Sequence, residues 1–166
     1  MKKIAIVPQT PPQCGTNVLT RRIASDIVVK NPLIDEIIAI LQKEGYLDAD
    51  ESVWTRLCLD EAVINAIKHG NREDKSKSVT VSLFTSKQHW SVRVEDEGEG
   101  FKTQDVPDVD VPQSLELEHG RGILLMQSYM DEIVYYDKGN RLQLTKRRKN
   151  CLRKILDHIL LFLKLK

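Results

Sequence analysis

Three short strings rich in acids and glycines constrain this chain more than any other feature. The first, Asp60–Asn71, reads DEAVINAIKHGN; the second, Glu95–Phe101, reads EDEGEGF; the third, Gly120–Ile123, reads GRGI. The first lies in a helical segment, the second ends an apolar strand, and the third opens a helix. A carboxylate, a carboxamide that can bind a metal, and glycines that admit phosphates are the components of a nucleotide site.

The composition is that of one soluble globular domain with its own core. The chain has 166 residues, of which 41% are hydrophobic and 30% are charged, and its formal net charge is +1. Because this charge creates no global field, we expect no direct contact with nucleic acid. The three cysteines lack metal-ligand spacing, which favours a reducing, cytoplasmic location, and no apolar run is long enough for a transmembrane segment.

Hydrophobic periodicity and turn residues predict an irregular N-terminal arm followed by alternating helices and strands. Asn31 is expected to cap the first helix, and Gly45 to stop it. Residues 102–119 form a long polar loop, of a length typical of lids and binding loops. The predicted strands are 20–30, 78–84, 89–95, 132–137 and 141–146, of which the second and third form a hairpin and the last two pair across the turn Lys138–Asn140. The predicted helices are 32–44, 48–69, which Gly70 and Asn71 end, 121–130 and 150–163.

The second predicted helix has charged residues on an apolar face. Val53, Leu57 and Ile64 lie on one face, and Glu61 and Lys68 continue the same stripe. We expect this stripe to face the core. A charged group there needs a functional reason, because burying an unpaired charge is costly.

Glu61 and Asn65 are four residues apart, so they share a helix face about one turn apart. The carboxylate can polarise a hydroxyl or water nucleophile, and the carboxamide oxygen can bind Mg²⁺. Taken alone, the pair also fits a solvated helix face.

Asp96 follows a strand, where its carboxylate can accept a hydrogen bond from an exocyclic amine such as that of adenine. Gly98 and Gly100 let the backbone approach a ligand closely, although the same string also fits a turn. The third string places glycines before a helix, which makes either an anion site or a plain loop-to-helix junction.

In this order, the three strings resemble the N box and the two glycine boxes of the Bergerat-fold, or histidine-kinase-like, ATPases. Within that superfamily, the chain is similar to the bacterial anti-sigma factor serine/threonine kinases over residues 20–147. The stretches that carry this closer similarity are Gly122–Met126, Met130–Glu132 and Leu144–Lys146. The resemblance implies a two-layer α/β (α+β) sandwich, with helices on one face of a mixed, mostly antiparallel sheet.

The resemblance also implies a role for each matching residue. Glu61 is expected to be the catalytic general base, Asn65 to hold Mg²⁺ against the phosphates of ATP, and Asp96 to read the adenine amino group. Residues 102–119 are expected to form the ATP lid. The other expected nucleotide contacts are Lys68, Gly98, Gly100, Gly120, Arg121, Gly122 and Thr145, of which Lys68 and Arg121 rest on charge and location alone.

The implied function is that of an ATP-dependent serine/threonine protein kinase that regulates transcription as an anti-sigma, partner-switching factor. Its expected partners are a small antagonist protein, which it phosphorylates, and a sigma factor, which it releases or captures. Two alternatives are the catalytic domain of a histidine kinase and a non-catalytic nucleotide-binding module. Against the first, the few residues before the first predicted strand cannot supply a helical segment with a phospho-acceptor histidine.

The predicted domain organisation is an N-terminal arm at 1–19, an ATPase domain at 20–147 and a basic amphipathic helix at 148–166. The apolar residues of the tail fall at helical spacing: Leu152, Ile155, Leu156, Ile159, Leu160 and Leu163. Such a helix either packs on the domain or on the second subunit of a homodimer, or presents a basic surface to a partner or an anionic membrane.

Overall fold

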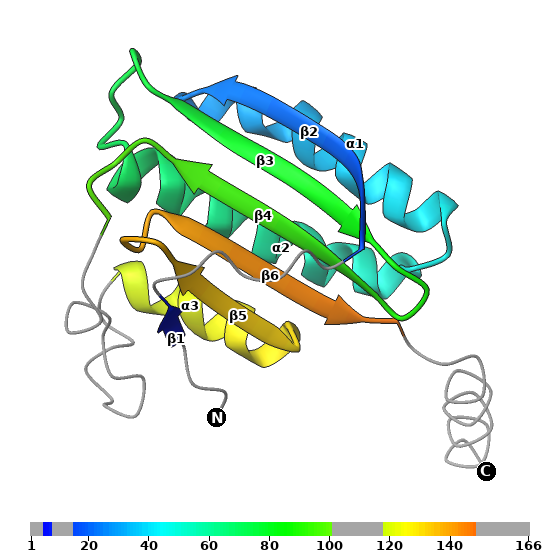
Figure 1. Ribbon diagram of the computed structural model, residues 1–166. Coiled ribbons are helices and arrows are strands. Elements are labelled where there is room, and N and C mark those ends of the chain that lie inside the picture. Colours follow the sequence, from blue (N-terminus) through cyan, green and yellow to red (C-terminus); the bar gives the residue numbers. More distant parts are fainter. Residues whose placement is uncertain (1–4, 8–14, 101–117, 149–166) are drawn as a thin grey trace, which may run out of the picture.

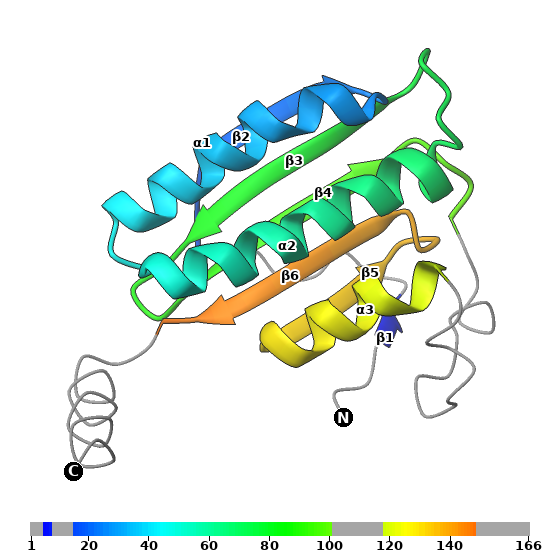
Figure 2. The same ribbon diagram turned by 180° about the vertical axis from the view of Figure 1, so that it is seen from behind.

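The computed structural model of the chain is a six-stranded sheet with helices on one face (Figures 1 and 2). The structure describes residues 5–7, 15–100 and 118–148. The predicted two-layer α/β sandwich is confirmed within these ranges. The predicted lid, apart from its last two residues, and the tail beyond Arg148 lie outside the described residues.

The sheet has the strand order β1-β5-β6-β4-β3-β2 and is mostly antiparallel, as predicted. Only the pairing of β1 with β5 is parallel. Both predicted hairpins form, β3 with β4 and β5 with β6. The strand bounds are β1 Ala5–Val7, β2 Thr16–Ala24, β3 Ser78–Thr85, β4 His89–Asp96, β5 Glu132–Tyr136 and β6 Arg141–Arg147.

Strand β4 shows how the sheet sets the direction of the site residues. Trp90, Val92 and Val94 are buried in the core between the sheet and the helices. Because side chains alternate along a strand, Asp96 has the same parity and points to the helix-covered face. The strand thus delivers a carboxylate to the edge of the core.

Helix α1, Lys30–Lys43, ends where the sequence predicts. Gly45 has a φ of +71°, its N–H donates to the Gln42 carbonyl at 3.0 Å, and the Tyr46 N–H donates to the Leu41 carbonyl at 2.8 Å. These two bonds form a Schellman motif, which satisfies the last carbonyls of the helix. Its start lies two residues before the predicted one, at Lys30, and its N-cap is Val29 rather than Asn31.

Helix α2, Ala49–Asn65, begins with a capping box in which Asp48 and Glu51 each accept a hydrogen bond from the other's backbone N–H. It continues as a single π-helical turn, η2, over Ala66–Gly70. The predicted helix over 48–69 is therefore confirmed, with a change in winding after Asn65. Such π turns are frequent at functional sites.

Helix α3, Glu118–Tyr129, begins earlier than the predicted start at residue 121. Gly120 and Gly122 therefore lie inside its first turns, not ahead of them. The prediction placed the helix start at the glycines, because glycine disfavours the interior of a helix. Packing of the helix against α2 and β5 outweighs that preference.

The predicted strand over 20–30 is wrong in both of its bounds. Strand β2 begins at Thr16, inside the predicted arm, and ends at Ala24. The β-branched run Ile27–Val29 is a short 3₁₀ helix, η1, whose first turn is capped by Asp26 through a 3.0 Å hydrogen bond from the Val28 N–H. This local capping bond outweighs the strand propensity of the run.

The predicted core-facing stripe of α2 is also wrong, because Val53 and Leu57 are exposed. The residues of α2 that enter the core are Cys58, Leu59 and Val63, on the opposite side of the helix. Both sides of the helix carry apolar residues at helical spacing, so the sequence pattern alone indicated the wrong side.

Within the described residues, no helix is long and apolar enough to cross a membrane.

Candidate nucleotide site

The carboxylate of Asp96 lies in a cradle made by two glycines. A Cβ atom on Gly70 would lie 2.3 Å from the Asp96 Cγ, and a Cβ on Gly98 would lie 2.1 Å from the Gly70 carbonyl oxygen. No side chain fits at either position without displacing its neighbours. The π turn of η2 and the loop after β4 therefore pack backbone to backbone beside this carboxylate.

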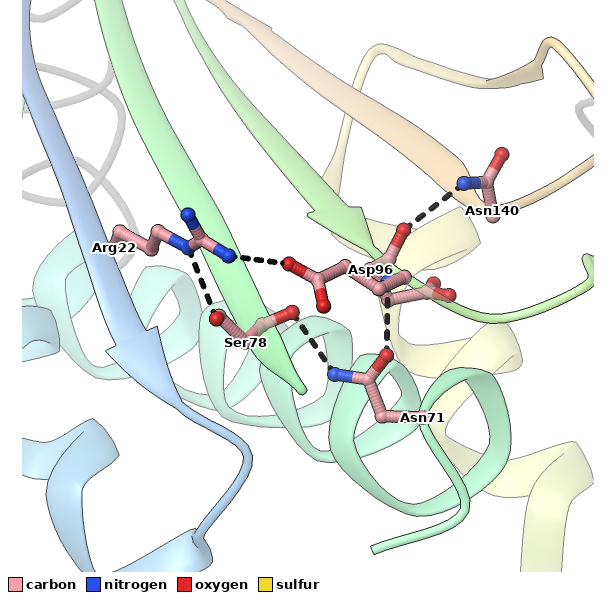
Figure 3. Close-up of polar contacts among 6 residues, drawn as sticks. Arg22, Asn71, Ser78, Asp96 and Asn140 are labelled. Carbon is pink, nitrogen blue, oxygen red and sulfur yellow. Dashed lines mark hydrogen bonds and ion pairs between the residues drawn. The ribbon is translucent and has the colours of Figure 1, made fainter. Parts of the chain in front are cut away.

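Asn71 holds the π turn against the sheet. Its side chain is fully buried; Nδ2 donates to the Ser78 carbonyl at 2.9 Å, and Oδ1 accepts from the Glu97 N–H at 2.8 Å. Figure 3 shows this side chain reaching from the end of the helix to the start of β3 and the end of β4. Asn71 thereby fixes the position of the residue next to Asp96.

Asn140 holds Asp96 from the other side, through the backbone. The Asn140 Nδ2 donates to the Asp96 carbonyl at 2.9 Å, and the Asp96 N–H donates to the Asn140 carbonyl at 3.0 Å (Figure 3). The Gly98 N–H donates to Oδ1 of the carboxylate at 2.8 Å. Among the described residues, the one hydrogen-bond donor to the Asp96 carboxylate is this N–H, and none reaches Oδ2.

Burial raises the pKa of Asp96 to about 6, whereas the Gly98 N–H and the charges of Lys138 and Lys77 act to lower it. Desolvation of the carboxylate outweighs these stabilising contacts. A buried carboxylate is stabilised in its ionised form by a further hydrogen-bond donor, such as an exocyclic amine.

Glu61 lies on the side of α2 that meets α3. A Cβ atom on Gly122 would lie 2.2 Å from the Glu61 Oε2 and 2.8 Å from its Cδ. The carboxylate therefore packs on the first turns of α3, in space that exists because residue 122 is glycine. The N-terminal end of a helix dipole favours negative charge at such a position.

Asn65 is the last residue of α2, one turn beyond Glu61 on the same face. Both side chains are half-buried. At 1.5 Å per residue, Glu61 lies on the order of 13 Å from Gly70 along the helix axis, so the Glu61–Asn65 end and the Asp96 end of the site are well separated. The predicted orientation of a nucleoside triphosphate, with its base at Asp96 and its phosphates near Asn65 and Glu61, runs between these two ends.

The other predicted nucleotide contacts lie at different distances from the Glu61–Asn65 end and the Asp96 end of the site. Lys68 lies in the π turn with an exposed side chain. Gly100 has a φ of +79°, and a Cβ there would lie 2.0 Å from the Lys138 carbonyl oxygen, so its contact is with the β5–β6 turn. Gly120 and Arg121 lie in the first turn of α3. The position of the Arg121 side chain is outside what the structure describes.

The structure does not bring Thr145 to the site. Thr145 pairs with Ser91, and their hydroxyl oxygens are 3.1 Å apart on the sheet face away from the helices. Ser91 lies about 17 Å along β4 from Asp96, given the rise of a strand. The residue before β6 that lies beside Asp96 is Asn140, which the sequence analysis interpreted only as part of a turn.

Gly70 and Asn71 were interpreted from the sequence as a helix stop, and their contacts with Asp96 and Glu97 were missed. A buried asparagine that bridges two strands has no local sequence signature, because its partners are 7 and 26 residues away. The signal that was available is that both residues belong to the first of the three strings.

The donor set fits Mg²⁺ that arrives with a nucleotide. Asn65 offers one hard amide oxygen, and Mg²⁺ usually takes one or two protein ligands together with phosphates and water. Across residues 5–7, 15–100 and 118–148, no three His, Cys, Asp or Glu side chains cluster to hold a metal by themselves.

These features define a nucleotide-binding domain of the ATPase type, and comparison with known families agrees. The family model described as "Histidine kinase-like ATPase domain" matches residues 29–146. The chain belongs to this family, and the resemblance inferred from the three strings is confirmed.

Proteins similar to this chain include serine-protein kinases and an anti-sigma factor. Serine-protein kinase RsbW of Bacillus licheniformis is 29% identical over 141 residues, which cover 76% of this chain and 88% of the relative. The anti-sigma F factor of Clostridium perfringens is 32% identical over 103 residues, 59% of this chain and 74% of the relative. Serine-protein kinase RsbW of Listeria monocytogenes serovar 1/2a is 29% identical over 98 residues, which cover 55% of this chain. The match spans 62% of that relative, which is less than two thirds of its length.

The raised pKa of Asp96 predicts how stability changes with pH. Because the folded-state pKa of about 6 lies above the ordinary 3.8, folding favours the protonated carboxyl. Its contribution to stability is fully present below about pH 4 and is lost as the pH rises through about 6. We therefore expect Asp96→Asn to raise the melting temperature of the nucleotide-free protein more at pH 7.5 than at pH 4.5.

The matched control is Glu99→Gln, which removes an exposed charge three residues further along the same loop. It should not show the same increase between the two pH values. If Asp96→Asn gives equal shifts in melting temperature at pH 4.5 and 7.5, the raised pKa is wrong.

Proposed function

We propose that this protein is an ATP-dependent serine/threonine protein kinase that acts as an anti-sigma, partner-switching factor. The observation that carries the proposal is the position of Glu61, which lies against Gly122 at the start of α3 and one helical turn from Asn65. A base and a metal ligand thus share the end of the site that lies away from the base-reading carboxylate. The names of the relatives, serine-protein kinase RsbW and anti-sigma F factor, support the same proposal.

The Asp96 end binds and orients the nucleotide. The Oδ2 of Asp96 accepts a hydrogen bond from the adenine amino group, while Gly70 and Gly98 leave room beside it. Asn71 and Asn140 hold this end rigid before the ligand arrives, which reduces the entropy cost of binding.

The Glu61 end performs the proton transfer. A serine or threonine hydroxyl of the protein substrate attacks the γ-phosphorus, the bond from that phosphorus to the β–γ bridging oxygen breaks, and ADP leaves. Glu61 accepts the hydroxyl proton as the new phosphate ester forms. When bound, Mg²⁺ supplies charge neutralisation to the phosphates, and Asn65 is the residue that would hold it.

The proposed partners are a small antagonist protein that bears the phosphorylated serine or threonine, and a sigma factor. The proposed location is the cytoplasm. The proposed ATPase domain is 20–147, close to the matched range of 29–146. Lys68, Arg121 and Gly120 remain proposed phosphate contacts.

Substitutions at Glu61 and Asn65 separate chemistry from binding. We expect Glu61→Gln to keep Mg-ATP affinity and to slow phosphoryl transfer by about 10²–10⁴, the usual effect of a general base. We expect Asn65→Ala to weaken Mg-ATP binding and transfer together. The measurements are calorimetric ATP affinity and single-turnover transfer from labelled ATP to candidate antagonist proteins.

The same assay tests the proposed function itself. Phosphoserine or phosphothreonine on an antagonist supports the kinase, phosphohistidine supports a histidine kinase, and no transfer supports a non-catalytic module. Transfer by Glu61→Gln at the wild-type rate would show that Glu61 is not the base.

Gly122 provides a second test at the same end. In Gly122→Ala the new Cβ overlaps the Glu61 carboxylate, whose flexible side chain must move away. Alanine is favoured over glycine in a helix by up to about 1 kcal/mol, so we expect stability to be kept or raised while transfer slows. In the Glu61→Gln background the same change should slow transfer little further, because the base is already absent. If Gly122→Ala and Glu61→Gln slow transfer by independent factors that multiply, the proposed contact between residue 122 and Glu61 does not affect transfer.

A further inference from the structure

The outward face of α2 carries an exposed apolar patch. Val53, Trp54 and Leu57 expose 59%, 50% and 41% of their surface, and they lie within about one turn of the helix. Single exposed apolar residues are ordinary, but three adjacent large ones indicate a surface that another element covers. We call these three residues the α2 patch.

The described helices flank the α2 patch and do not cover it. On one side, α1 contacts α2 through the ion pair of Asp35 with Arg56. On the other side, α3 contacts α2 through the Tyr129 hydroxyl, which donates to the Glu51 carbonyl at 3.1 Å. The positions on either side of α2 are therefore occupied by α1 and α3. The α2 patch lies between them on the outer surface of the helix layer, the layer that Figure 2 shows in front of the sheet.

The chain leaves the described fold beside the start of α2. The Arg148 N–H donates to the Gln88 carbonyl at 2.7 Å, and its guanidinium donates to the Glu44 carbonyl at 3.2 Å. The same guanidinium lies 4.9 Å from the centroid of the Tyr46 ring. Arg148 is thus fixed at the α1–α2 connection, and Val53 lies in the second turn of the helix that begins there.

The segment that follows has the composition to cover such a patch. Six of its apolar residues, between Leu152 and Leu163, recur at helical spacing, and as a helix they would span about 17 Å. Its basic residues Lys149, Arg153 and Lys154 complement the exposed Asp50 in the acidic first turn of α2. The short connection from Arg148 gives the segment a high effective concentration at the patch.

We propose that residues 149–166 dock as an amphipathic helix on the α2 patch of the same chain. The apolar stripe of the segment covers Val53, Trp54 and Leu57, and its basic residues lie toward the first turn of α2. Val28, which is also exposed, precedes α1 at the end away from Arg148, so it is outside the proposed contact.

Tryptophan quenching tests this proposal directly. The chain has two tryptophans, and Trp90 is fully buried, so a neutral collisional quencher reports on Trp54. In the full chain, we expect Leu156→Asp with Leu160→Asp to shift emission to the red and to increase the quenching constant by about twofold or more, because half of the Trp54 surface becomes accessible. A chain that ends at Lys149 should behave in the same way.

Two controls make the result specific. Lys166→Gln, at the end of the segment and outside its apolar stripe, should leave quenching at the wild-type value. Trp54→Phe in each background gives the signal of Trp90 for subtraction. The protection of Trp54 should be independent of protein concentration.

Either of two results would overturn the proposal. Equal quenching in the wild type and the double aspartate variant would show that the segment does not cover Trp54. Protection that increases with protein concentration, together with a doubled mass in solution, would show that a second copy of the chain covers the patch instead.

Discussion

The two hydrogen bonds of the Asn71 side chain hold together the parts of the structure on which the site depends. They join the end of the long helix to β3 and to the residue after Asp96, in a position that water does not reach. A buried amide with both groups satisfied is rigid, because breaking either bond would leave an unpaired polar group. Asn71 holds the π turn and its glycine beside the carboxylate proposed to read the base, and Asn140 holds Asp96 from the other side.

Helix α2 serves the core and the site with different faces. Cys58, Leu59 and Val63 anchor it on the sheet, and this packing fixes its rotation. The rotation in turn directs Glu61 toward α3, where Gly122 leaves space for the carboxylate. The position of the proposed base thus follows from core packing, and the absence of one side chain on the neighbouring helix makes that position available.

Local periodicity predicted where some of the proposed site residues lie. The spacing of four puts Glu61 and Asn65 on one helix face, and the apolar alternation before Asp96 puts Asp96 at the end of a strand, whereas their roles were implied by the resemblance of the three strings. Asn140 and Asn71 could not be found in this way, because their partners come from distant strands. The wrong placement of Thr145 has the same cause, since strand register decides which residue of a hairpin reaches Asp96.

The hairpins were predicted from periodicity and turn residues, and the fold class was implied by the resemblance of the three strings. The outward rotation of Val53 and Leu57 required knowledge of the neighbouring sheet.

The most direct test of the nucleotide site is the affinity of the wild-type protein for Mg-ATP and Mg-GTP, measured by calorimetry beside Asp96→Asn. In the proposed role, Asp96 accepts a hydrogen bond from the adenine amino group and repels the carbonyl that guanine presents there, so we expect ATP to bind about tenfold to hundredfold more tightly than GTP. Asp96→Asn should lose most of that preference, and equal affinities for ATP and GTP in the wild type would contradict the account.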